Sequence, residues 1–145
     1  KEIILIDEDS PLEIHYDQGG EVTIFDETHA VSPIERTIVI TNHTKVTWYG
    51  IASGNSTYSL KFVTQSGESI VRMLLLSRKE EKLSITVHST LAQSHTVTNI
   101  HILSLVGDAG IILLNGTVQI DSGIEKVKGH ILEENIFLGS KGNIR

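Results

Sequence analysis

The feature that most constrains this chain is a repeated two-residue alternation of apolar and polar side chains, interrupted at short intervals by turn-forming residues. Successive side chains of a β-strand point to opposite sides, so this alternation is typical of strands with one buried face. The clearest alternating segments are 12–16, 21–25, 83–87, 96–100 and 116–120. Turn signals lie at 19–20, 32–33, 53–55, 66–67, 107–110, 121–123 and 139–142. The pattern predicts a stack or sandwich of short strands.

The residue types agree with this prediction. The 145 residues include 20 Ile, 13 Thr and 11 Val but only 4 Ala, and β-branched side chains favour strands over helices. Segment 68–81 is the one place where a helix can be argued, but it lacks a polar face at helical spacing, so we predict a buried strand there. We expect a single all-β domain over residues 1–145, which is long enough to bury a core.

Charge and cysteine content exclude several classes of function. With 12 Lys and Arg against 18 Asp and Glu, the net charge is −6, which disfavours nucleic acid and anionic membranes as partners because both require clustered cations. The absence of cysteine excludes a disulfide framework, a thiolate nucleophile and thiolate metal ligands. No apolar stretch approaches the roughly 20 residues of a membrane-spanning helix, and the apolar segment 3–6 is too short for a signal peptide. We therefore expect a cytoplasmic protein.

The residues alone leave the architecture open between sandwich, barrel and solenoid. Most of the segments alternate cleanly, as strands with one face toward water do. No strict repeat requires a solenoid. Composition alone therefore favours a β-sandwich.

The second half of the chain contains an ordered series of segments at 83–88, 92–96, 99–110, 115–120, 123–130 and 131–138. Gly116, Gly129, Asn135 and Leu138 occupy, in order, the places of a strand that ends in glycine and a short apolar strand before a small turn, then a polar segment and a leucine-rich strand with asparagine. In this order and spacing, residues 83–138 resemble the SufB/SufD family of iron–sulfur cluster assembly proteins. The resemblance implies a right-handed parallel β-helix in place of the sandwich. It also implies tight corners at Gly107, Gly110, Gly116 and Gly123.

For function, the resemblance implies a non-catalytic scaffold, not an enzyme. Its implied partners are a Suf-type ABC ATPase and a second SufB/SufD-like subunit or a second copy, in a homo- or hetero-oligomer. Exposed strand edges at a coil end make such pairing physically reasonable. Family members are longer and have helical ends, so residues 1–145 are expected to be a core or fragment. The Cys-Ser-His-Gly segment of the family has no counterpart here, so we expect no cofactor in this chain, only the family's association with iron–sulfur clusters.

Seven histidines are the candidates for a metal site: His15, His29, His43, His88, His95, His101 and His130. No two of them show the close local spacing that zinc proteases and cupin-type sites use. We predict no metal site; His88, His95, His101 and His130 are the candidates that come nearest to one. His88, His95 and His101 are expected to lie on stacked strands and face the same way, and His130 lies within the family-like segment. The alternative for each is a polar surface role.

A carbohydrate-binding β-sandwich module is the main alternative function. Trp48, Tyr49 and Tyr58 are the aromatic residues that would stack on a sugar, and packing at an edge strand is the other explanation for Trp48 and Tyr49. A cupin-type metal enzyme is a third possibility, which would require clustered histidines. The charged segments 7–9 and 78–82, together with Glu133 and Glu134, are predicted to be solvated.

Overall fold

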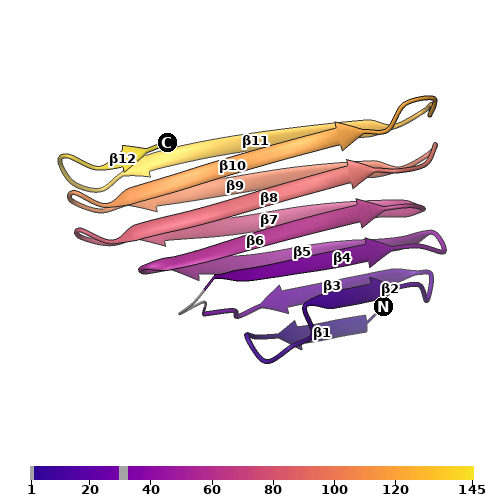
Figure 1. The fold of residues 1–145 in the computed structure, drawn as a ribbon, viewed down its shortest axis with the longest axis horizontal. Helices are drawn as coiled ribbons and strands as arrows, with labels where there is room; N and C mark the ends of the chain where they lie inside the picture. The colour runs from indigo at the N-terminus through magenta and orange to yellow at the C-terminus, as the bar shows by residue number, and fades with distance from the viewer. Residues whose placement is uncertain (1, 30–32) are drawn as a thin grey trace.

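The computed structural model describes residues 2–29 and 33–145. The strands in these ranges are β1 (Glu2–Ile6), β2 (Glu13–Tyr16), β3 (Glu21–Asp26), β4 (Ile34–Ile40), β5 (Thr44–Ser53), β6 (Ser56–Thr64), β7 (Gly67–Ser77), β8 (Lys82–Leu91), β9 (Val97–Val106), β10 (Ile111–Ile120), β11 (Lys128–Phe137) and β12 (Asn143–Ile144). Figure 1 shows them as stacked, nearly parallel ribbons.

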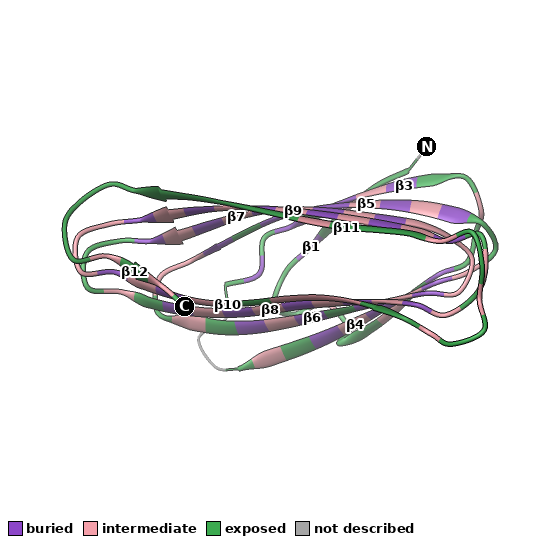
Figure 2. Ribbon diagram, turned by 90° about the horizontal axis from the view of Figure 1, so that it is seen from above, coloured by how far each residue is buried: buried purple, intermediate pink, exposed green. Residues whose placement is uncertain are grey.

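The strands form two parallel sheets that lie face to face, as Figure 2 shows from above. Sheet A contains the odd strands in the order β1-β3-β5-β7-β9-β11, and sheet B contains the even strands in the order β12-β10-β8-β6-β4-β2. Each coil contributes one strand to each sheet, so neighbours within a sheet are two strands apart in sequence. The predicted parallel β-helix is confirmed. The sandwich alternative is wrong because neighbouring strands are parallel and are joined through the opposite sheet.

Most sequence-predicted segments fall where expected. The segment 68–81 forms most of β7 and the turn that follows it, and the turn signals lie in the connections between strands, with Ser53 and Gly67 at strand ends. Of the turn at 32–33, only Pro33 lies in the described ranges. Gly107, Gly110 and Gly123 lie in turns, whereas Gly116 lies within β10, so its predicted place at a corner is wrong. A side chain at Gly116 would approach the Glu133 carboxylate from the facing sheet to 3.0 Å.

The coils differ in length, which explains why no strict repeat is visible in the sequence. Val22 pairs with Val46, 24 positions later, whereas Val97 pairs with Lys128, 31 positions later. The strands keep their register while the connecting turns absorb the extra residues. A parallel β-helix requires the inward positions to be apolar in every coil, but it does not require identical coils.

Inward side chains from the two sheets form the hydrophobic core. Trp48 from sheet A and Phe62 from sheet B meet edge to face, with ring centroids 5.5 Å apart, and both are fully buried. Burial of each such aromatic or aliphatic side chain contributes about 1.5–3 kcal/mol. Gly50 leaves room beside them for Met73, whose side chain would have to move if position 50 carried a Cβ.

A buried polar cluster joins the two sheets near the first coils. The Tyr58 hydroxyl donates to Asp26 Oδ2 (2.9 Å) and accepts from Arg36 Nη1 (2.7 Å). Trp48 Nε1 also donates to Asp26 Oδ2 (3.3 Å), and Thr28 accepts from Arg36 (2.9 Å). Burial, followed by the nearby Asp26 carboxylate, raises the pKa of Tyr58 above its usual range. The cluster satisfies groups whose isolated burial would be costly.

Four hydroxyl side chains form a second buried polar cluster, where β6 turns into β7. Ser69 Oγ accepts from Thr64 (3.2 Å) and donates to Thr98 (2.7 Å), which also shares a hydrogen bond with Ser89 (2.8 Å). These residues come from both sheets, and each is buried. Small hydroxyl residues fit here because they can satisfy one another in a narrow corner.

Candidate interaction face

The outer face of sheet A has apolar side chains concentrated in three neighbouring rows, beside rows that contain Lys45, Glu68, Thr47 and Asn99. The strand register places outward side chains in rows that cross the strands. The first row contains Phe25, Tyr49, Arg72, His101 and Leu132. The second row contains Ile51, Leu74, Leu103 and Glu134. A third row reads Ser53, Leu76, Leu105, Ile136. We call the apolar members of these rows the apolar band: Phe25, Tyr49, Ile51, Leu74, Leu76, Leu103, Leu105, Leu132 and Ile136.

Several residues of the apolar band are strongly exposed. Ile51 is 58% exposed, Ile136 47% and Tyr49 43%. The Phe25 and Tyr49 rings stack with centroids 5.4 Å apart and an interplanar angle of 17°, so the aromatic part of the band has a fixed geometry. Contiguous apolar surface of this kind is typical of an interaction site.

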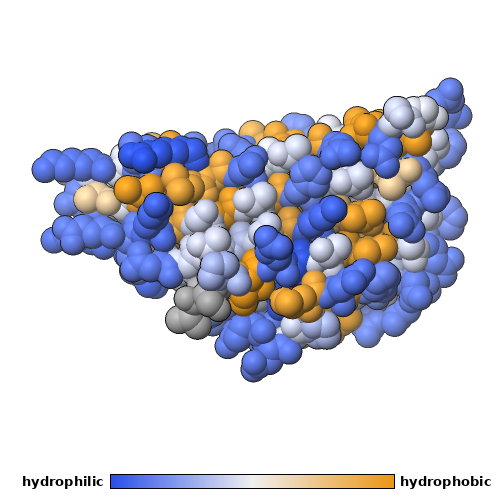
Figure 3. Space-filling view, viewed as in Figure 1, coloured by the Kyte–Doolittle hydropathy of each residue, from blue (hydrophilic) through white to orange (hydrophobic). Residues whose placement is uncertain are grey.

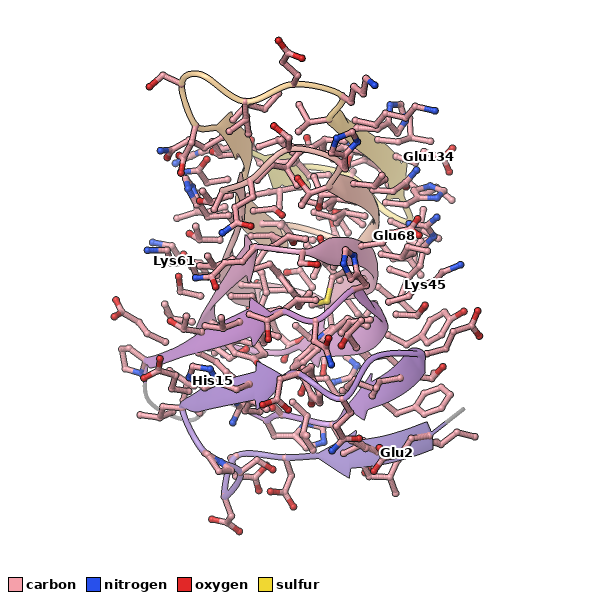
Figure 4. All side chains as sticks on the ribbon, turned by 90° about the vertical axis from the view of Figure 1, so that its right-hand side faces the viewer. Glu2, His15, Lys45, Lys61, Glu68 and Glu134 are labelled. Atoms are coloured by element: carbon pink, nitrogen blue, oxygen red, sulfur yellow. The ribbon has the colours of Figure 1, made fainter. Side chains whose placement is uncertain are left out.

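The outer face of sheet B is different. One of its outward rows contains Thr37, Lys61, His88 and Thr117. A second row contains Glu35, Ser59, Thr86 and Asn115. Figure 3, which faces sheet B, shows apolar patches separated by intermediate and hydrophilic residues. Figure 4 places Lys61 on this side of the solenoid and Lys45, Glu68 and Glu134 on the other.

A hollow of about 520 Å³ lies in the apolar band and extends across β3, β5, β7, β9 and β11. Ile51, Leu74 and Leu103 belong to the middle row of its lining, and the Phe25–Tyr49 stack lies beside them. Glu27, which directly follows β3, and Glu134 on β11 belong to its two ends. The hollow is therefore an apolar groove with a carboxylate at each end.

Two further polar side chains line the groove. Arg72 Nη1 donates to the Val71 carbonyl (3.0 Å), the Asn99 carbonyl (3.2 Å) and Asn99 Oδ1 (3.0 Å), so this part of the guanidinium is held against β9. His101 Nε2 lies 3.7 Å from Glu134 Oε2. The charged side chains of the groove are thus the exposed carboxylates of Glu27 and Glu134, the buried carboxylate of Asp26, which belongs to the polar cluster of the core, and the Arg72 guanidinium, whose donors are partly occupied.

The structure does not bring the candidate histidines together. His88 lies on the outer face of sheet B, His101 on the outer face of sheet A, and His95 in the turn between β8 and β9. The expectation that these three face the same way is wrong, because consecutive strands belong to opposite sheets. His130 is exposed on β11, paired with Asn99 in register. Within residues 2–29 and 33–145, no group of three or more His, Asp or Glu residues is placed to hold a metal ion.

The aromatic residues proposed for sugar binding are also separated. Trp48 is fully buried and Tyr58 is 3% exposed, whereas Tyr49 faces outward. Trp48 and Tyr49 lie on β5, which is flanked by β3 and β7 and is not an edge strand. A three-aromatic sugar platform is therefore wrong, since two of the rings face the core.

The charged segments predicted to be solvated lie at the surface. Residues 7–9 form an exposed turn after β1, and the segment 78–82 connects β7 to β8. Glu133 and Glu134 are both exposed on β11 and point to opposite sides of sheet A, as neighbours in a strand do.

Sequence reasoning missed the apolar band, although the sequence contains a signal for it. Residues 74–76 are three consecutive leucines, and β9 has apolar residues at both inward and outward positions. Strands that are apolar on both faces are typical of sheets covered on both sides. The leucines at 74–76 therefore indicate a strand that is apolar on both its inner and its outer face.

The donor set does not fit the iron–sulfur cluster that the resemblance associates with the family. The chain has no cysteine, and the candidate histidines lie on opposite faces or in turns. No chemical step is therefore assigned to a cluster here.

Comparison of the chain with protein-family models, with curated proteins and with solved structures gives no match. Across the described part of the chain, no helix has the length and apolar character needed to cross a lipid bilayer.

Proposed function

We propose that this chain is the β-helical core of a non-catalytic scaffold protein of the SufB/SufD kind. In this proposal it acts in the cytoplasm with a Suf-type ABC ATPase and with a second SufB/SufD-like subunit or a second copy. The observation that carries the scaffold role is the apolar band on the outer face of sheet A. The sequence resemblance over residues 83–138 supplies the identity of the partners.

The size of the apolar band supports a protein-binding role. Five strands spaced about 4.8 Å apart and three outward rows spaced about 6.6 Å apart give a flat area on the order of 300 Å², which the nine residues of the apolar band share with Arg72, His101 and Glu134. Patches of roughly 300–600 Å² on soluble proteins are often functional. The outer face of sheet B offers an internal control, because it is built on the same core with polar rows.

The test is co-purification of the tagged chain from its source cells, alongside a form extended to the natural stop codon. Mass spectrometry should identify an ABC-type ATPase and a β-helical subunit. A double variant of the apolar band, Ile51→Thr with Leu103→Thr, should lose at least one of them, whereas Thr86→Ala on sheet B should retain both. Capture of neither partner by either wild-type form would overturn the SufB/SufD assignment. Equal capture by the double variant would overturn the role of the band.

A further inference from the structure

We propose that the groove on the outer face of sheet A is a docking site for an amphipathic α-helix of a partner protein, with an apolar stripe and a basic residue near each end. This inference rests on the proposed scaffold function, which supplies a protein partner, and it adds the chemistry of the segment that binds. In this inference the apolar floor of the groove is formed by Ile51, Leu74 and Leu103. The acidic ends are formed by Glu27 and Glu134.

The dimensions of the groove fit a short helix. The groove is lined by five neighbouring strands of sheet A, from β3 to β11, and four strand spacings of about 4.8 Å give about 19 Å. A helix rises about 1.5 Å per residue, so this length corresponds to about 13 residues. Side chains at i, i+3, i+4 and i+7 of such a helix would contact Ile51, Leu74 and Leu103, in the way that helix-in-groove complexes use apolar anchors.

The charges favour a basic partner. Glu27 and Glu134 lie at opposite ends of the groove, and the intervening Arg72 already donates to carbonyl and amide oxygens of β7 and β9. A Lys or Arg near each end of the helix would meet a carboxylate, and such pairs at the rim of an interface set orientation and association rate. An acidic helix would be repelled at both ends.

The same charges disfavour two other occupants. A second copy that packed through the same face would bring two more carboxylates toward Glu27 and Glu134, with one further Arg72 to offset them. An anionic lipid surface would be repelled by the two carboxylates and by the net charge of −6. A basic amphipathic helix satisfies both the apolar floor and the acidic ends.

The probe is a labelled 18-residue helical peptide with leucines at i, i+3, i+4 and i+7 and lysines about 12 positions apart. Two control peptides have glutamates in place of the lysines, or the same composition in an order that breaks the apolar stripe. Fluorescence anisotropy with the purified chain should show binding of the lysine peptide, weakened by salt, and at least about tenfold weaker binding of both controls.

Matched protein variants locate the binding site. Glu27→Gln with Glu134→Gln should weaken binding of the lysine peptide about tenfold. Glu13→Gln with Glu35→Gln removes two carboxylates from the outer face of sheet B and should leave the affinity within about twofold. Because Trp48 is fully buried, its unchanged emission spectrum verifies that each variant is folded.

Several outcomes would overturn the inference. These are equal binding of the lysine and glutamate peptides, no binding of either, or equal loss in the two double variants. A dimer in sedimentation that Leu74→Lys dissociates would instead assign the groove to a second copy, and binding to anionic vesicles in competition with the peptide would assign it to lipid. If the peptide binds but no ATPase is captured, the groove is a helix-docking site and the SufB/SufD assignment is wrong. If an ATPase is captured but the peptide does not bind, the scaffold function is supported and the helix-docking proposal is wrong.

Discussion

The outer faces of sheets A and B cover the same core with different chemistry. On sheet B, the row Glu35, Ser59, Thr86, Asn115 is polar throughout, whereas the row Ile51, Leu74, Leu103 on sheet A is apolar until it reaches Glu134. Most inward positions of both sheets are apolar, and the buried polar residues there include the two hydrogen-bonded clusters together with Ser77 and Ser104.

This difference shows which residues hold functional information in a parallel β-helix. Inward residues are constrained by the core, so their apolar character follows from the fold alone. Outward residues are free to be polar, as most of sheet B demonstrates. The apolar residues at outward positions of sheet A are therefore the observation on which the proposed binding role depends.

The largest expected effect is a loss of stability that tests whether the two sheets unfold as one cooperative unit. Arg36 on sheet B is 1% exposed and reaches both the Tyr58–Asp26 pair and the carbonyls of Asp7, Ser10 and Pro11. Arg36→Met leaves Asp26 without its counter-charge and those carbonyls without a donor. The free energy of unfolding should fall by about 3–5 kcal/mol, measured by urea denaturation.

The readouts for this variant are Trp48 fluorescence and far-ultraviolet circular dichroism, whose transitions should coincide if both sheets unfold together. Arg78→Met, in the exposed turn at 78–82, is the control and should change stability by less than about 0.5 kcal/mol. A cost below about 1 kcal/mol for Arg36→Met would show that the cluster does not hold the two sheets together.

The second prediction concerns the core at alkaline pH, where two inward tyrosines of sheet B titrate. Burial, with a smaller contribution from Glu2, raises the pKa of Tyr16 to about 12, and the pKa of Tyr58 is raised as well. Unfolded tyrosine titrates near pH 10, so the folded protein binds more protons between about pH 10 and 12. Stability should be complete below about pH 10 and fall as the pH rises toward 12.

Urea midpoints at pH 9, 10 and 11 check this alkaline loss of stability. Tyr16→Phe should flatten the decline relative to wild type, because it removes one of the two groups, although its own stability at pH 9 will differ. A midpoint that stays constant from pH 9 to 11 in the wild type would contradict the prediction.

The strands were predictable because their main determinants are local, but those local determinants alone favoured a sandwich. Alternation at 83–87 and 96–100 and the glycine-containing turns indicated strands and their limits, and the resemblance over 83–138 supplied the parallel β-helix. The candidate site was not predictable in the same way, because it depends on which strands become neighbours. Tyr49 lies beside Arg72, which is 23 positions later in the sequence, and Arg72 lies beside His101, which is 29 positions later. Because the coils differ in length, the sequence does not reveal which residues become neighbours.

The errors have the same physical origin. His88 and His101 were expected to face the same way, but alternate strands belong to opposite sheets, so strands that are consecutive in sequence present opposite faces. Trp48 and Tyr49 are adjacent in sequence, and the pleat of the strand therefore directs one ring into the core and the other to the surface. Sequence alone did not show which of the two would be buried.

The third prediction exchanges the chemistry of the two faces at matched outward positions. Leu103→Thr on sheet A should reduce retention on a hydrophobic column, with a cost of about 1 kcal/mol because Leu103 is only partly buried. Thr86→Leu on sheet B should increase retention with little change in stability. If neither substitution altered retention, the apolar band would not differ functionally from the polar rows of sheet B.

The smallest expected effect on stability comes from Glu134→Gln, which tests whether the charge at the end of the groove contributes to binding without contributing to folding. Glu134 and His101 are 3.7 Å apart with side chains 55% and 37% exposed, and exposed ion pairs contribute about 0–1 kcal/mol. Glu134→Gln should therefore change the free energy of unfolding by less than about 0.5 kcal/mol while it weakens binding of the lysine peptide. Urea denaturation and anisotropy on the same preparation measure the two effects. In the proposed docking site Glu134 acts in recognition and contributes little to folding. A variant that lost stability without losing peptide affinity would contradict this role.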